Sequence, residues 1–104
     1  ANLFDYTEEA TLIIKNSDKE LMKKVIHNLD KIENWKSNLI EDLIKIIVGD
    51  LNVKLFNILA PLRAAVTGQK YSPSIYLILE IIGKDIVTSA NEKRTEKPQT
   101  ASKT

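Results

Sequence analysis

The stretch LAPLRAAVTGQKYSPSIYLILEIIGKDIV, residues 59–87, contains apolar segments at helical spacing, separated by residues typical of helix ends. Residues 59–66 form the C-terminal half of a helix that we expect over about 53–66, because Leu, Ile and Val recur there with the helical period. Gly68 is expected to end that helix. Ser72 and Pro73 are then expected to begin a new helix, as its N-cap and its first helical residue. The pattern therefore predicts a helix, a short polar loop and a second helix.

The second helix is expected over 73–82, and Gly83 separates it from a short helix over 84–90. Pro61 lies inside the preceding helix, where a proline removes one hydrogen bond and is expected to kink or break the helix. Apolar and polar residues do not alternate over any long run of the chain, so no strands are expected.

Three further helices are expected upstream of this stretch. Their segments are about 7–15, a stripe from 17 to 32, and about 35–48. Thr7 is a candidate N-cap, Ser17 with Glu20 matches a capping box, and Gly49 is a candidate stop. The sequence thus predicts an all-α fold, a compact bundle of five or six short helices over residues 1–90.

Composition is that of one soluble domain followed by a polar tail. The chain has 104 residues, of which 43% are hydrophobic and 28% charged. Residues 91–104, NEKRTEKPQTASKT, hold no large apolar side chain, so we expect a disordered tail. No apolar run is long enough to cross a bilayer and no signal peptide is visible, so no membrane role is expected.

Charge is nearly balanced, with 15 basic and 14 acidic residues and a net charge of +1. This excludes nucleic-acid binding by bulk positive charge alone. Residues 1–50 carry seven basic and ten acidic residues, whereas 51–90 carry four basic and two acidic ones. An anionic partner would therefore prefer the second half of the chain.

No catalytic constellation or metal site is expected. The chain has no cysteine, which fits a cytosolic location, and its one histidine, His27, is expected on a helix surface. The three glycines lie too far apart for a phosphate-binding loop. Trp35 is expected to fill the core at a helix start, the alternative being a platform for ligand stacking. Tyr71 and Tyr76 are expected at the boundary with their hydroxyls in water, the alternative being stacking on a base.

Arg63 is one of only two arginines among the fifteen basic residues, and it lies among apolar and small neighbours. Two interpretations stand equal on the residues alone. It forms an internal ion pair, with Glu80 or Asp85, or its guanidinium lies at the mouth of a groove and meets a phosphate or a base edge.

Residues 59–87 also resemble the C-terminal anticodon-binding region of bacterial-type glutamyl-tRNA synthetases. The matching motifs, at matching spacing, are Pro61-Leu62-Arg63, Thr67-Gly68, Ser72-Pro73 and the run Glu80-Ile81-Ile82-Gly83-Lys84. The resemblance extends over about residues 7–90. It departs after Thr67-Gly68, where Gln69-Lys70 stand in place of a usual basic residue, and near Thr88-Ser89-Ala90, which lack an arginine.

The resemblance implies that residues 1–90 bind the anticodon loop of a glutamate-specific tRNA. The anticodon-binding positions it implies are Arg63, Ser72, Pro73 and Ile75, with Thr67 in support. Further RNA contacts are expected from Lys70, Tyr71, Tyr76 and Lys84. An unstacked base can rest on Pro73 or Ile75, and its edge can bond to N–H groups at the helix start.

The resemblance also implies a larger parent enzyme, a class I glutamate–tRNA ligase that uses ATP and Mg²⁺ and works in the cytoplasm. Its catalytic domain and signatures have no counterpart in these residues, so this chain is expected to be a catalytically inactive part that needs no cofactor and is monomeric. Two alternatives stay open. One is a helical protein-interaction module with an apolar groove for a partner helix, and the other is a free-standing tRNA-binding adaptor.

Overall fold

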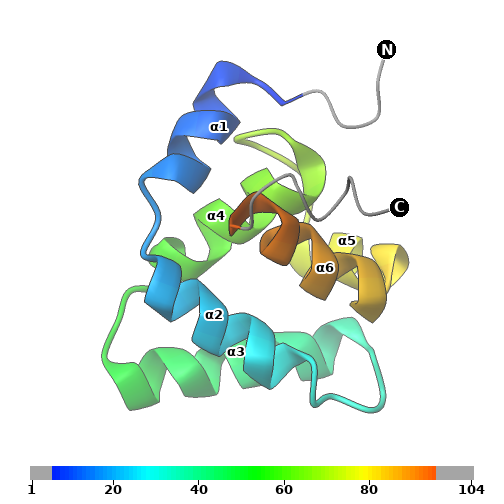
Figure 1. Ribbon diagram of the computed structural model, residues 1–104. Coiled ribbons are helices and arrows are strands. Elements are labelled where there is room, and N and C mark those ends of the chain that lie inside the picture. The colour runs from blue at the N-terminus through cyan, green and yellow to red at the C-terminus, as the bar shows by residue number, and fades with distance from the viewer. Residues whose placement is uncertain (1–5, 96–104) are drawn as a thin grey trace, which may run out of the picture.

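Within residues 6–95, which the computed structural model describes, all regular structure is helical (Figure 1). Side chains are described up to Ser89. The helices are α1 (Glu8–Lys15), α2 (Lys19–Leu29), α3 (Ser37–Leu51), α4 (Leu55–Thr67), α5 (Ile75–Ile82) and α6 (Lys84–Thr95). The predicted all-α fold with six short helices is confirmed.

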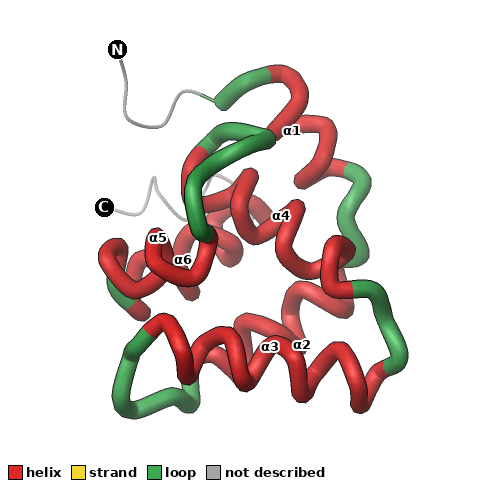
Figure 2. Tube along the Cα trace, turned by 180° about the vertical axis from the view of Figure 1, so that it is seen from behind, coloured by secondary structure: helices red, strands yellow, loops and turns green. Residues whose placement is uncertain are grey.

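The helices α2 and α3 lie side by side at the bottom of the molecule, and α4 crosses above them (Figures 1 and 2). The helix α1 packs only onto the far side of α4, while α6 packs against α2, α4 and α5. The helix α5 packs against α3. The loop over 68–74 therefore joins a central helix to one that is docked on the lower layer.

A single apolar core fills the space between these helices. Its largest fully buried side chains come from five of them: Met22, Val25, Leu29, Ile40, Ile44, Ile58, Leu62, Leu79 and Val87. Each apolar stripe predicted from sequence spacing contributes to this cluster. The core thereby fixes the central helix α4, which carries Arg63.

The N-cap of α1 is the residue predicted from the sequence, whereas the N-cap of α2 is not. Thr7 caps α1, since its hydroxyl accepts the N–H of Ala10 at 3.0 Å. The predicted cap of α2 at Ser17 is wrong, because the carboxylate of Asp18 accepts the N–H of Leu21 at 3.1 Å. Ser17 instead donates its hydroxyl to the carbonyl oxygen of Ile14 at 2.7 Å. Ser17 therefore binds a carbonyl oxygen at the C-terminus of α1, and Asp18 is the N-cap of α2.

The helix α3 runs past Gly49, so the predicted stop there is wrong. It ends at Asn52, whose φ of 55° is left-handed. Asparagine tolerates this conformation, and the cost of a glycine inside a helix, about 1 kcal/mol, is too small to end it.

The helix α4 continues through Pro61, so the proline does not break it. Pro61 and its neighbours Ala60 and Leu62 are buried, and this packing compensates for the one missing backbone hydrogen bond. Gly68, with a φ of 72°, ends the helix as predicted.

The helix α5 begins two residues later than predicted, at Ile75, with Ser74 as its N-cap residue. The hydroxyl of Ser72 cannot cap it, because it accepts a hydrogen bond from Arg63 and donates one to the carbonyl oxygen of Pro73. Gly83, with a φ of 99°, ends α5 as expected.

The last helix is longer than predicted. It continues over residues 91–95, which the sequence assigned to a disordered tail. Glu, Lys and Arg are good helix formers, and extending an existing helix needs no new nucleus. The rest of the predicted tail, residues 96–104, lies outside the described residues.

Replacing the N-cap of α2 gives a first test of these boundaries. Asp18→Ala should lower the free energy of unfolding by about 0.5–2 kcal/mol, since an orphan N–H group loses its acceptor. Asp18→Asn should stay close to wild type because asparagine caps equally well. Urea unfolding followed by circular dichroism measures both. An Asp18→Ala variant as stable as wild type would mean that Ser17 is the effective cap.

Candidate nucleic-acid interface

Arg63 lies on α4 and is tied to the loop over 68–74. Its Nε–H donates to the hydroxyl oxygen of Ser72 at 2.7 Å, and that hydroxyl donates to the carbonyl oxygen of Pro73 at 2.8 Å. The side chain of Arg63 is partly exposed. Because Nε–H is only one of five guanidinium donors, the two amino groups of the fork stay available to a ligand.

The ion pair considered for Arg63 does not form. The carboxylate of Glu80 accepts the backbone N–H of Ser37 at 2.7 Å and so caps α3. Among the side chains that the structure describes, the one ion pair within 4.0 Å joins Lys45 to Glu41. The interpretation with an available guanidinium therefore agrees with the geometry.

Thr67 closes the base of the loop. Its hydroxyl donates to the carbonyl oxygen of Arg63 at 2.7 Å and accepts the N–H of Gln69 at 3.0 Å. A backbone bond of 3.0 Å from Thr7 to the carbonyl oxygen of Gly68 holds the same turn from the side of α1. Thr67 thus supports the loop, and its part in anticodon binding stays a prediction.

The outer part of the loop presents exposed groups. Lys70, Tyr71 and Pro73 are all exposed, and Tyr71 is the most accessible aromatic ring of the described residues at 77%. The ammonium of Lys70 lies 5.3 Å from the centre of the Tyr71 ring. A cation, an aromatic face and a proline ring on one short loop are the groups that bind unstacked bases and phosphates.

Ile75 and Tyr76 lie differently from the positions the sequence assigned them. The side chain of Ile75 is 3% exposed and belongs to the core, so a base cannot rest on it. Only its backbone N–H, in the first turn of α5, is left for a ligand. Tyr76 packs partly into the core, and its hydroxyl is buried rather than in water.

The Tyr76 hydroxyl is the one buried side-chain polar atom without a hydrogen-bond partner in the described part of the chain. Burial, and then the negative charge of Glu41, raise its pKa above the ordinary value of 10.0. The positive charges of Lys45 and Arg63 oppose that rise. Charged groups of α3 and α4 therefore both influence the ionisation of this hydroxyl of α5.

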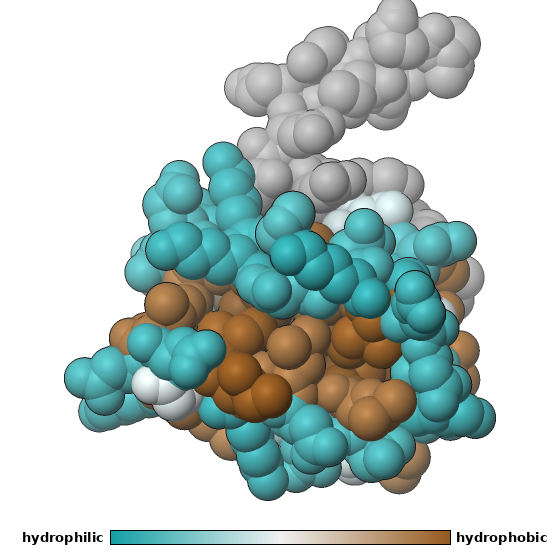
Figure 3. Space-filling view, turned by 90° about the horizontal axis from the view of Figure 1, so that it is seen from below, coloured by the Kyte–Doolittle hydropathy of each residue, from teal (hydrophilic) through white to brown (hydrophobic). Residues whose placement is uncertain are grey.

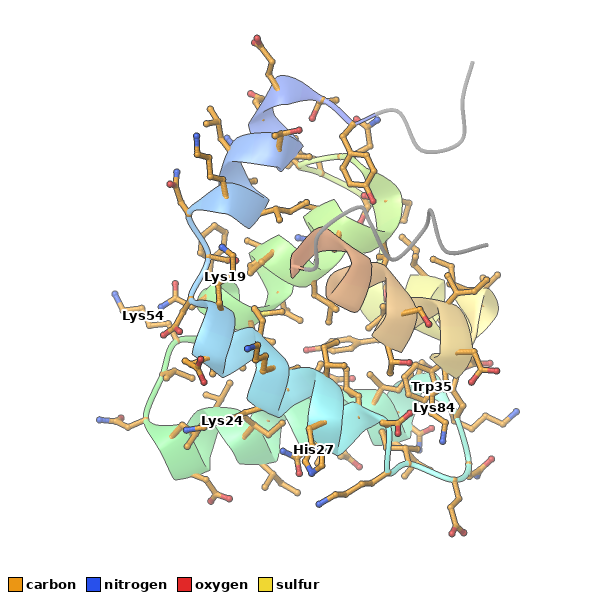
Figure 4. All side chains as sticks on the ribbon, in the orientation of Figure 1. Lys19, Lys24, His27, Trp35, Lys54 and Lys84 are labelled. Carbon is orange, nitrogen blue, oxygen red and sulfur yellow. The ribbon has the colours of Figure 1, made fainter. Side chains whose placement is uncertain are left out.

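Lys84 is held by the end of α2. Its ammonium donates to the carbonyl oxygens of Asp30 at 3.0 Å and Ile32 at 2.6 Å. Figure 4 shows Lys84 and Trp35 together at the lower end of α6. This ammonium satisfies backbone carbonyls, which is a different role from the RNA contact expected of it.

Trp35 has the structural role expected of it. Its ring packs against the core and its Nε1–H donates to the carbonyl oxygen of Leu79 at 2.8 Å. Together with the bond between Glu80 and Ser37, this contact holds α5 against the start of α3. Sequence spacing could not reveal this pair of contacts, because the partners lie more than forty residues apart.

His27 and the acidic side chains of the described residues were further candidates for a site. His27 is exposed on α2, and no group of three His, Cys, Asp or Glu side chains there could hold a metal ion (Figure 4). No helix in residues 6–95 has the length and apolar character needed to cross a membrane.

A second exposed surface is apolar. Seen from below, apolar side chains extend across the face on which α3 lies (Figure 3). Leu39, Ile46 and Leu51 of α3 are exposed there, and a small groove of about 180 Å³ lies between α2 and α3. This face is where the alternative function, a protein-interaction module, would act.

Removing the buried hydroxyl should not destabilise the fold. Tyr76→Phe should unfold at the same temperature as wild type or higher, because a buried polar group without a partner costs about 1–3 kcal/mol. Burial raises the pKa of Tyr76 in the folded state, so ionisation is more costly there than in the unfolded chain, and stability falls as the pH rises from about 10 through the folded pKa. Thermal unfolding at pH 7–11 should therefore show wild type losing more stability above pH 10 than Tyr76→Phe. A lower melting temperature for the variant at pH 7 would show that the hydroxyl is bonded.

Removing the ammonium of Lys84 should destabilise the fold. Lys84→Met leaves two carbonyl oxygens at the end of α2 without their charged donor, and should cost about 1.5–3 kcal/mol. Lys24→Met, at an exposed position of α2, is the matched control and should change stability by less than about 0.5 kcal/mol. Urea unfolding measures both. Equal effects of the two substitutions would contradict the capping role of Lys84.

Comparison with known proteins completes this description. A model of the family described as "Anticodon binding domain" matches residues 2–90. Three similar relatives are the proteins named glutamate–tRNA ligase 2 of Rickettsia felis, Rickettsia typhi and Rickettsia massiliae, which are 42%, 41% and 40% identical over 80 residues. The match covers 77% of this chain but only 16–17% of those relatives, so the chain spans about a sixth of their length. Since the family model covers nearly the whole helical bundle, the chain belongs to the anticodon binding domain family.

Proposed function

We propose that this chain binds the anticodon loop of glutamate tRNA, as the anticodon-binding part of a larger glutamate–tRNA ligase. The observation that supports this most directly is the hydrogen bond from Arg63 Nε to Ser72. It orients a guanidinium fork beside a loop with an exposed tyrosine, lysine and proline. A planar fork held in one orientation suits a base edge or a phosphate, because it binds through two parallel hydrogen bonds.

The contacts can be divided between three kinds of group. Tyr71 and Pro73 offer surfaces on which unstacked bases can stack. Arg63 reads a base edge or holds a phosphate, and Lys70 adds positive charge. The first turn of α5, from Ile75 onward, offers backbone N–H groups that lack partners within the helix. Thr67 and Ser72 fix the loop rather than bind the RNA through their own side chains.

The remaining functions belong to the rest of the proposed enzyme. We infer that the parent protein joins glutamate to its tRNA in the cytoplasm, with ATP and Mg²⁺ bound by a catalytic domain outside these residues. This chain's own part is to position the tRNA by its anticodon loop, one domain to one tRNA. The apolar face on α3 supports the alternative function, a module that binds a partner helix, which an RNA-binding measurement separates from the first.

Substitution of Arg63 tests the proposal. The chain is titrated with fluorescently labelled anticodon stem-loop RNA that carries either a glutamate anticodon or a substituted one. Arg63→Lys and Arg63→Ala should each lose about 1–3 kcal/mol of discrimination between the two RNAs, the usual scale of a bidentate base contact. Lysine should fail because a point charge cannot form the planar fork.

The matched control is Lys24→Ala on α2, which should keep both affinity and discrimination. Circular dichroism checks that the Arg63 variants remain folded. If wild type bound both RNAs equally, the proposed anticodon recognition would be wrong, and the protein-interaction alternative would be favoured. If Arg63→Lys kept full discrimination between the two RNAs, the base would be recognised by the N–H groups at the start of α5 and not by Arg63.

A further inference from the structure

The flank of α3 that faces α5 carries an exposed ion pair. The ammonium of Lys45 lies 2.9 Å from the carboxylate of Glu41, one helical turn away. Their side chains are 60% and 37% exposed, so both are open to solvent. Lys45 is the only basic residue of α3, whose other charged residues are Glu41, Asp42 and Asp50. Ser37, which is bonded to Glu80 of α5, precedes Glu41 and Lys45 at four-residue spacing, so this single cation of an acidic helix lies on the flank toward α5.

This flank adjoins the Arg63 site through Tyr76. Tyr76 belongs to α5, which packs against α3, and its buried hydroxyl is influenced by the charges of Glu41, Lys45 and Arg63 together. Geometry agrees with this, because Glu80, one turn after Tyr76 on α5, accepts the N–H of Ser37, and Glu41 and Lys45 follow Ser37 at four-residue spacing on the same stripe of α3. Arg63 in turn is bonded to Ser72, four residues before Tyr76. The apolar face of α3 is separate, since Leu43, Ile46 and Asp50 line the groove toward α2.

The helices that carry the two charged groups are held together by several contacts. Trp35 and Glu80 bond α5 to the start of α3, and the core holds α4. Positive groups at a fixed separation suit a partner with regularly spaced negative charges, which the phosphates of a nucleic acid provide.

We propose that Lys45 is a second RNA contact, which binds a backbone phosphate next to the nucleotide held by Arg63, and that Glu41 is the counter-charge displaced by that phosphate. The inference rests on the proposed anticodon binding and extends its surface from the loop onto α3. An exposed ion pair is worth only about 0–1 kcal/mol, so exchanging Glu41 for a phosphate costs little.

The test uses the same labelled stem-loop RNA and three single variants of the chain. Lys45→Gln should bind about 3- to 10-fold more weakly near 0.1 M salt and should reduce the slope of log affinity against log salt by about 0.9, the value of one phosphate contact. Glu41→Gln should bind about 2- to 5-fold more tightly, because the phosphate no longer competes with a carboxylate. Lys24→Gln, an exposed lysine of α2, controls for the loss of one positive charge and should leave the affinity and slope within about 1.5-fold of wild type.

The outcomes separate this inference from the proposed function. If Arg63→Ala loses binding while Lys45→Gln matches Lys24→Gln, the contact on α3 is wrong and anticodon binding stands. A Glu41→Gln variant that binds more weakly than wild type would also overturn the role given to Glu41. If wild type does not bind the stem-loop, both proposals fail together. Melting temperatures of all variants within a few degrees of wild type confirm that binding, not folding, is compared.

Discussion

The hydrogen bond from the Trp35 indole to the carbonyl oxygen of Leu79 is the contact on which the arrangement of the second half of the chain depends. It joins the segment before α3 to the middle of α5, and Glu80 adds a second bond to the start of α3. With α5 docked in this way and α4 buried in the core, the loop over 68–74 is held at both ends. A loop held at both ends needs little further ordering when it binds, which lowers the entropic cost of recognition.

Arg63 donates to Ser72 through Nε and keeps its two amino groups available to a ligand. This explains why position 63 carries arginine in a chain where lysine is the usual cation. Only a guanidinium can donate through Nε to a fixed hydroxyl and still present a planar fork outward. A lysine here could still donate to several acceptors, but its ammonium is a point charge and offers no planar fork. In the proposed function this position therefore combines loop geometry and RNA binding in one side chain.

Two lysines show the opposite case. The ammonium of Lys19 donates to carbonyl oxygens at the end of α1, including that of Ile14 at 2.8 Å, and Lys84 does the same at the end of α2. These charges neutralise the negative ends of helices inside the fold. Counting basic residues along the sequence thus overestimates the charge that is free to meet an anionic partner, and Lys84 is the example among the expected RNA contacts.

Local sequence was sufficient for the helical class, for the Thr7 cap and for the ends at Gly68 and Gly83, because these depend on spacing, side-chain caps and glycine's access to a positive φ. For Arg63 the residues alone left two interpretations equal, an internal ion pair or a guanidinium at the mouth of a groove. Tertiary structure alone decided that Ser72 binds Arg63 instead of capping α5, that Ile75 and the Tyr76 hydroxyl are buried, and that Lys84 closes α2. In each of these cases the deciding partner comes from a different helix or loop, and no local pattern records which distant group will satisfy a given donor or cover a given side chain.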